Sequence, residues 1–125
     1  TSVLGHVYTY DFKREHNNWS AIEPIELFDV NIVNYEANRK TRIVETLSKL
    51  ARGKDILSLW LDCDKEGENI CYETIYCCYN SMNKKNYQQI YRAKFSSITK
   101  NDLKAAFNNM SSLPNKNESS SVDCR

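Results

Sequence analysis

Apolar residues recur at helical spacing in two stretches of the chain. Residues 41–53 place their apolar side chains on one face and end in Gly53, which suits a C-terminal cap. A second stretch begins after Gly67, and its apolar stripe contains Cys71, Ile75, Cys78 and Met82. We therefore predict two amphipathic helices, the first a surface helix and the second packed on a sheet through its stripe, with the cysteines of the second helix buried as small apolar residues.

Three other segments have the character of strands. Residues 22–33 alternate and are rich in β-branched side chains, with Pro24 suited to a strand start or a sheet edge. Residues 56–61 form an unbroken apolar run, which is typical of a strand at the centre of a parallel sheet. This run predicts that Trp60 lies in the core. Residues 88–95 form the third expected strand.

A third helix and the order of the elements complete the expected fold. The segment from Thr99 to Asp102 predicts a capping box, which opens a helix that runs to about Met110. Strand and helix alternate, which favours an α/β fold with an open, mainly parallel, Rossmann-like sheet and helices on both faces. We expect one domain over residues 1–110, followed by a linker or the beginning of the next domain over residues 111–125.

Composition excludes several classes of protein. Lys and Arg number 17 against 16 Asp and Glu, so the formal net charge of +1 identifies no partner. The apolar runs are much shorter than the roughly 20 residues that cross a bilayer, so we expect no membrane contact. Five cysteines without Cys-x-x-Cys spacing favour a reducing, intracellular compartment and argue against zinc. The chain opens at Thr1 without Met, as though already within a strand, so we expect a fragment of a longer protein.

The strongest chemical signal is the segment Asp62-Cys-Asp64-Lys-Glu66-Gly-Glu68, directly after the predicted strand at 56–61. Four carboxylates this close repel one another unless a cation or a shared proton offsets the repulsion. Asp62 and Asp64, two apart on extended backbone, suit one Mg²⁺ ion, and Glu66 reaches it directly or through water. Gly67 allows a tight turn into the following helix. We predict a magnesium site at this sheet edge. A solvated acidic turn that caps the helix is the alternative, and EF-hand spacing is absent.

The same segment carries a family resemblance. Residues 59–70, LWLDCDKEGENI, resemble the Asp-x-Asp-x-Glu-Gly-Glu signature of the Toprim domain in type IA DNA topoisomerases, closest to the topoisomerase III branch. Residues 1–12, 24–29, 92–99 and 114–125 resemble further segments of that branch, so the resemblance covers nearly the whole chain. The chain has Lys65 where the family usually has Arg, and Ser97 where it usually has Glu. Neither departure removes a predicted metal ligand.

The resemblance implies a Mg²⁺-dependent enzyme that cuts one DNA strand by tyrosine attack, passes another strand through the gap and reseals it. It implies that Asp62, Asp64 and Glu66 are catalytic and bind magnesium, and that Glu68 is a supporting acid. By the same resemblance, the first Toprim strand with its catalytic Glu precedes Thr1, and the nucleophilic tyrosine lies in a later domain. We expect this fragment alone to be inactive.

Some basic residues are candidate contacts to DNA, and the resemblance also implies partners. Candidate DNA contacts are His6, Lys65, Arg92 and Lys94. His6 alternatively has a purely structural hydrogen-bonding role. The pair Lys84-Lys85 is expected in a solvated turn, and Trp19 has no assigned role. The resemblance implies single-stranded DNA as substrate, a RecQ-type helicase and an OB-fold accessory protein as partners, and the nucleus as location. Two other classes stay open, namely a Toprim nuclease or primase and a non-catalytic Toprim scaffold that binds DNA.

Overall fold

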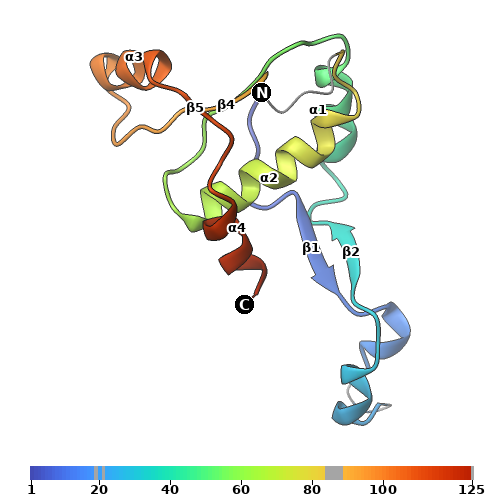
Figure 1. Ribbon diagram of the computed structural model, residues 1–125. Coiled ribbons are helices and arrows are strands. Elements are labelled where there is room, and N and C mark those ends of the chain that lie inside the picture. Colours follow the sequence, from blue (N-terminus) through green and yellow to red (C-terminus); the bar gives the residue numbers. More distant parts are fainter. Residues whose placement is uncertain (19, 21, 84–88, 125) are drawn as a thin grey trace.

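Two small sheets and a long central helix organise the molecule (Figure 1). The computed structural model describes residues 1–18, 20, 22–83 and 89–124. One sheet pairs β1 (Tyr8–Asp11) with β2 (Val33–Glu36) in antiparallel register. The other has the order β3–β4–β5, from β3 (Leu57–Leu59), β4 (Ile90–Arg92) and β5 (Ser111–Ser112). The α-helices are α1 (Ile43–Ala51), α2 (Lys65–Tyr79), α3 (Lys100–Asn108) and α4 (Lys116–Asp123).

The parallel pair β3 and β4, joined through α2, confirms the predicted α/β class. Leu57 lies opposite Ile90 and Leu59 opposite Arg92, and β5 then runs antiparallel to β4. The carboxyl end of β3 leads directly into the acidic segment and the start of α2. This topology places the acidic segment at the sheet edge where ligands of α/β proteins bind.

Helix α2 carries the core on two of its faces. On one side, Cys71 and Ile75 pack with Leu59 and Ile90 of the parallel strands. On the other side, a second cluster joins α2 to α1 and to the start of β1, and it consists of Val7, Leu47, Ala51, Cys77, Cys78 and Met82. The predicted stripe is thus confirmed, because all four of its members are buried.

The predicted third helix is also confirmed, together with its cap. Thr99 has extended backbone, and its hydroxyl accepts a hydrogen bond from the Asp102 amide at 3.3 Å. The Asp102 carboxylate in turn accepts from the Thr99 hydroxyl at 2.7 Å and from the Ser97 hydroxyl. These two hydrogen bonds lower the pKa of Asp102 below its ordinary value, although slight desolvation opposes them.

The strand predicted over residues 22–33 is wrong. Residues Pro24–Phe28 form a short 3-10 helix, η2, and β2 starts only at Val33. Pro24 occupies the first turn of η2, where its fixed φ favours a helical start. Ile25, Phe28 and Ile32 of this segment are 75%, 89% and 61% exposed, so they are not buried as the inward residues of a sheet strand would be. A second short 3-10 helix, η1 (Arg14–His16), precedes η2, and together they form an extension beyond β1 and β2.

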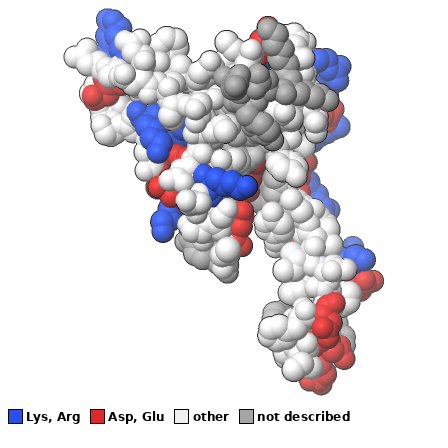
Figure 2. Space-filling model, in the orientation of Figure 1, with Lys and Arg blue, Asp and Glu red and all other residues white. Residues whose placement is uncertain are grey.

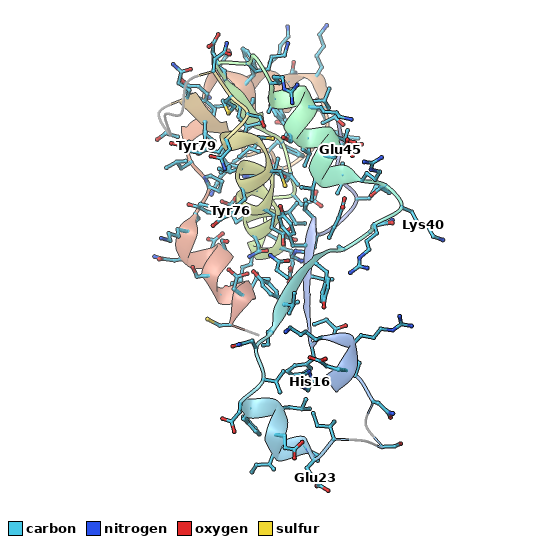
Figure 3. All side chains as sticks on the ribbon, turned by 90° about the vertical axis from the view of Figure 1, so that its right-hand side faces the viewer. His16, Glu23, Lys40, Glu45, Tyr76 and Tyr79 are labelled. Atoms are coloured by element: carbon cyan, nitrogen blue, oxygen red, sulfur yellow. The ribbon has the colours of Figure 1, made fainter. Side chains whose placement is uncertain are left out.

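The extension lies apart from the core. Figure 3 places His16 and Glu23 at its far end, well away from Tyr76 on α2. Figure 2 shows acidic side chains gathered at its tip, where Glu23, Glu26 and Asp29 are exposed.

Three other expectations need correction. The chain is not in a strand at Thr1, because β1 begins at Tyr8 after a glycine, Gly5, with φ of +73°. Strand β3 lies at the edge of the described sheet rather than at its centre. Trp60 is 38% exposed and not in the core, because it follows the last paired residue of β3.

Residues 111–124 are ordered and packed. β5 adds to β4, and the α4 residue Ser119 is buried where its backbone oxygen accepts from the Asn69 side chain at 3.1 Å. The same amide group donates to Asp123 at 2.9 Å, which ties α4 to α2. Whether a further domain begins here stays a prediction. In the described part of the chain, no helix combines the length and apolar character that a bilayer span requires.

Candidate functional site: an acidic loop at the end of a parallel strand

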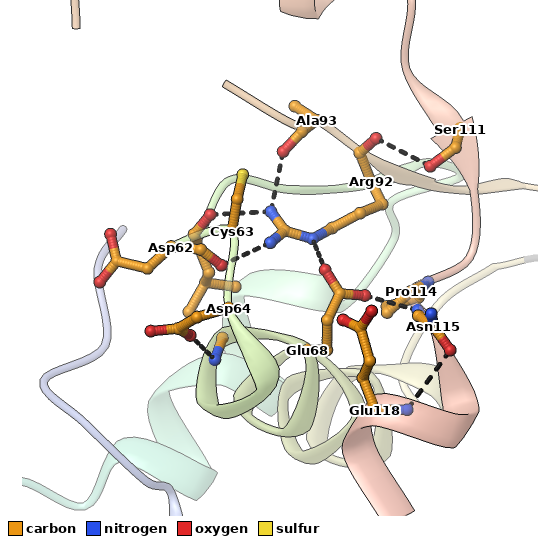
Figure 4. Close-up of polar contacts among 12 residues, drawn as sticks. Asp62, Cys63, Asp64, Glu68, Arg92, Ala93, Ser111, Pro114, Asn115 and Glu118 are labelled. Carbon is orange, nitrogen blue, oxygen red and sulfur yellow. Dashed lines mark hydrogen bonds and ion pairs between the residues drawn. The ribbon is translucent and has the colours of Figure 1, made fainter. Parts of the chain in front are cut away.

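A buried ion pair holds the acidic loop in place. Glu68 and Arg92 are 1% and 0% exposed, and Nε of Arg92 donates to Oε1 of Glu68 at 2.9 Å (Figure 4). The guanidinium also donates to the backbone oxygens of Leu61, at 2.9 Å, and Asp62, at 2.7 Å. One arginine of β4 therefore fixes both the end of β3 and the first turn of α2.

Glu68 links this pair to the C-terminal segment. Its second carboxylate oxygen accepts a hydrogen bond from the backbone amide of Asn115, immediately before α4. Asn115 itself caps α4, since its side-chain oxygen accepts from the amides of Asn117 and Glu118. Glu68 is thus buried beneath the loop, where both of its carboxylate oxygens are used by hydrogen bonds within the chain.

Gly67 is required by a close approach of backbone to backbone. A Cβ atom built at Gly67 would lie 1.9 Å from the carbonyl oxygen of Asp62. The loop therefore folds back onto the first turn of α2 at a distance that a side chain does not permit. The sequence correctly suggested a tight turn here, and the reason is this contact.

Asp64 caps α2 while Asp62 stays exposed beside it. Oδ1 of Asp64 accepts from the Gly67 amide at 2.7 Å, which satisfies one of the free N–H groups at the helix start. Both aspartates are exposed, and Figure 4 shows their carboxylates on the side of the loop away from Glu68. A cap bond uses one lone pair of a carboxylate, so Asp64 retains acceptor capacity toward solvent.

His6 lies beside the loop and contacts two carboxylates of α2. Its Nε2 lies 2.9 Å from Oε2 of Glu66, and its Nδ1 lies 3.2 Å from Oε1 of Glu73. The other oxygen of Glu73 accepts from the Val7 amide at 2.7 Å. Partial burial lowers the pKa of His6, but the hydrogen bonds and charges of Glu66 and Glu73 outweigh it and raise the pKa above 6.5. His6 thus contacts a predicted site carboxylate.

These pairings divide the four carboxylates into two groups. Glu68 faces Arg92, and Glu66 faces His6, so two of the acids have cationic partners within the chain. Within residues 1–18, 20, 22–83 and 89–124, no ion pair is formed by Asp62 or Asp64. Part of the repulsion among the four carboxylates is therefore offset within the chain, whereas Asp62 and Asp64 are exposed and form no such ion pair among the described residues.

The three predicted metal ligands do not converge on one point. Among the residues that the structure describes, no three His, Cys, Asp or Glu side chains come together as a metal cluster. Asp62 and Asp64 nevertheless fit Mg²⁺, because their oxygens are hard ligands and both residues are exposed, and Asp62 also lines an open groove. Mg²⁺ is commonly held by one or two carboxylates together with water and substrate phosphate.

The candidate DNA contacts have different positions. Arg92 does not fit a DNA contact, because it is fully buried and its guanidinium binds Glu68 and backbone carbonyls. Lys65 and Lys94 are exposed, and Lys94 lines the groove with Asp62 and Cys63. Trp19 and the pair Lys84-Lys85 lie outside the described residues.

Sequence reasoning missed Glu73 and Asn115. Glu73 follows Glu66 by seven residues, two turns along the same face of α2, so the spacing places both on one face, where His6 contacts each of them. Asn115 has the residue type and position of a helix N-cap, but the carboxylate that its amide meets is 47 residues earlier. No local pattern predicts that contact.

Comparison with known proteins adds family information. Residues 1–98 match the family described as "Toprim domain". The chain is 46% identical over 125 residues to "DNA topoisomerase 3-beta" of Arabidopsis thaliana and 45% identical over 130 residues to "DNA topoisomerase 3-beta-1" of Homo sapiens. It is 37% identical over 125 residues to human "DNA topoisomerase 3-alpha". Each match covers 100% of this chain but only 14%, 15% and 12% of these relatives, respectively.

Proposed function

The chain belongs to the Toprim domain family, and from that premise we propose that it is the magnesium-holding part of a type IA DNA topoisomerase of the topoisomerase 3 kind. The proposal rests on the likeness of the whole of this chain to one segment of topoisomerase 3 proteins, together with an exposed Asp62 and Asp64 after the carboxyl end of a parallel strand. The family supports DNA as the substrate, and the resemblance supports a single strand as the part that is cut.

Asp62 and Asp64 are the proposed ligands of Mg²⁺. When bound, the ion stabilises negative charge on a phosphate and its neighbouring oxygen. The chain's own residues give the site its form. Arg92 and Glu68 fix the backbone on both sides of the two aspartates. His6 positions Glu66, which we propose as a further member of the site through water.

Two exposed lysines are the proposed phosphate contacts of this groove. Lys94 lines it, and Lys65 stands at the start of α2. A lysine supplies a point charge rather than the planar fork of arginine, so it holds a phosphate without fixing its orientation. The helix N-terminus beside Lys65 favours the same anion.

Partners and location follow from the family resemblance alone. A RecQ-type helicase, an OB-fold accessory protein and the nucleus are proposals of this kind. They call for co-purification and localisation of the full-length protein.

The test replaces Asp62 and Asp64 together by Ala in the full-length protein. We expect magnesium-dependent relaxation of supercoiled DNA to fall by orders of magnitude, while the affinity for single-stranded DNA changes little. The matched control is Glu23→Ala with Asp29→Ala, which removes two exposed acids from the distant extension. Unchanged relaxation in the Asp62 and Asp64 variant would refute the assignment.

The products of the reaction separate the other classes. A topoisomerase yields closed circles of altered linking number. A nuclease would leave strands that are not resealed, a primase would extend primers, and a scaffold would bind DNA without changing it.

A further inference from the structure

Trp60 forms a fixed aromatic surface next to the acidic loop. Its ring stacks on Phe95, with ring centroids 6.0 Å apart and planes inclined by 30°. Its Nε1 donates to the Ser58 hydroxyl at 2.8 Å, which holds the edge of the indole. Trp60 is still 38% exposed, so part of this rigid ring faces solvent. Trp60 therefore presents an aromatic ring of fixed orientation to a ligand.

Helix α3 brings a third aromatic ring and two lysines to the same place. An open groove joins Trp60 to residues of α3, which are Lys100, Leu103, Lys104, Phe107 and Asn108. Their spacing of three and four puts them on one face of the helix. Phe107 on this face is 62% exposed, whereas the one buried residue of α3, Ala106, lies on another face. Figure 1 shows α3 set apart from α1 and α2, so this face is not packed against either helix.

The charge of this surface is positive. Lys100 and Lys104 lie on α3 beside Phe107, and Lys94 precedes Phe95. The nearby acid, Asp102, points to the hydroxyls of Ser97 and Thr99, which donate to it. In Figure 2, Lys or Arg side chains lie over the α3 end of the molecule, with a smaller acidic group between them. An anionic ligand is therefore favoured here.

We propose that this surface binds single-stranded DNA by stacking bases on its rings and contacting phosphates with its lysines. We call it the aromatic-lysine surface, and it consists of Trp60, Phe95, Phe107, Lys94, Lys100 and Lys104. Aromatic rings that alternate with cations are how proteins hold single strands without sequence preference. Lysine is depleted in protein–protein interfaces, so a rim of three lysines favours nucleic acid over a protein partner.

The surface is continuous with the acidic loop. The groove that contains Asp62 is also lined by Lys94, Phe95 and Ile98, and Ile98 lines the groove along α3 as well. A strand whose phosphate lies at Asp62 would therefore continue over Phe95 and Trp60 toward α3. The inference rests on the proposed function only for the choice of DNA as the nucleic acid.

The test measures binding of fluorescein-labelled oligothymidylate to the full-length protein over a range of salt concentrations. Phe107→Ala should raise the dissociation constant about fivefold or more, without changing its dependence on salt. Lys100→Ala with Lys104→Ala should reduce the slope of log affinity against log salt by about 1.4, or 0.7 for each lost phosphate contact. Matched controls are Phe28→Ala, at a site 89% exposed on η2, and Lys40→Ala, and both should bind as the unaltered protein does.

A second measurement locates the DNA directly. Oligonucleotides that contain 5-iododeoxyuridine should cross-link on irradiation to peptides with Trp60 or Phe107, and Phe107→Ala should abolish the second cross-link. Unchanged affinity together with no cross-link on α3 would overturn the proposal. So would a clear fall in melting temperature in Phe107→Ala at unchanged affinity, since another part of the protein would then cover this face.

The two proposals fail separately. Normal binding by these variants, with relaxation still dependent on Asp62 and Asp64, would remove the aromatic-lysine surface and leave the metal assignment intact. Loss of the cross-links in Phe107→Ala, with relaxation independent of Asp62 and Asp64, would support the aromatic-lysine surface and remove the metal assignment.

Discussion

Replacing Glu68 by Ala should open the acidic loop, because it leaves a charged arginine buried without its partner. The Glu68 side chain is 1% exposed and that of Arg92 is 0% exposed. Removal of the carboxylate also deprives the Asn115 amide of its acceptor. The guanidinium would then move toward water and release the carbonyls of Leu61 and Asp62.

The expected cost is large for a single side chain. Loss of one partner from a buried ion pair costs about 3–5 kcal/mol, compared with about 0–1 kcal/mol for an exposed pair. Arg92→Met should lower the free energy of unfolding by a similar amount, since it leaves Glu68 and several backbone carbonyl oxygens without their hydrogen-bond donor. The double variant should cost less than the sum of the two, because no unpaired charge remains buried.

Hydrogen exchange of the full-length protein, read by mass spectrometry, measures this locally. A loss of about 3 kcal/mol accelerates exchange by roughly 100-fold in the peptides that cover residues 61–70. Glu45→Ala is the control, because Glu45 pairs with Lys49 at 2.6 Å on the exposed side of α1 and is remote from the loop. Acceleration of less than threefold in Glu68→Ala would refute the view that this pair holds the loop.

Three further predictions concern other residues. Gly67→Ala should lower the melting temperature despite the better helix propensity of Ala, because its Cβ would lie 1.9 Å from the Asp62 oxygen, and a higher melting temperature would contradict this. Burial lowers the pKa of His6, but the hydrogen bonds and charges of Glu66 and Glu73 raise it by more, so the pKa in the folded protein exceeds 6.5. The stability from His6 should be complete below about pH 6.5 and fade as pH rises through the folded pKa. The difference in melting temperature between the unaltered protein and His6→Gln should therefore be greater at pH 6 than at pH 9, and an equal difference at both would count against it. Burial raises the pKa of Cys71 to about 12 and that of Cys78 to about 11. Iodoacetamide at pH 8 should therefore modify the exposed Cys63 and Cys124 but not the buried Cys71 and Cys78, as peptide mass spectrometry would detect. Comparable labelling of Cys71 would show that α2 is not packed as described.

The elements predicted best are those whose pattern reflects burial. The apolar faces of residues 41–53 and of α2 are covered by one another and by the sheet, so helical spacing located both helices. The prediction of a strand over residues 22–33 failed because Ile25, Phe28 and Ile32 are largely exposed, so the apolar pattern of this segment does not reflect burial. Alternation predicts a strand only where a neighbour buries one face.

The candidate site was located from sequence, but its internal contacts were not. Asp62 and Asp64 follow a strand, so their position at a sheet edge was predictable. The partners of Glu66 and Glu68 come from His6, 60 residues earlier, and Arg92, 24 residues later. Such pairs depend on how the chain packs. A local signal for Arg92 did exist, because it stands in the apolar strand after Ile90, where a buried cation needs an anionic partner.

The most direct test of the account is the binding of Mn²⁺, as a probe for Mg²⁺, followed by electron paramagnetic resonance in the full-length protein. We predict a bound Mn²⁺ signal that Mg²⁺ displaces, that Asp62→Asn with Asp64→Asn abolishes, and that Lys104→Ala leaves unchanged. An undiminished signal in the Asn variant would contradict the claim that these two aspartates hold the ion.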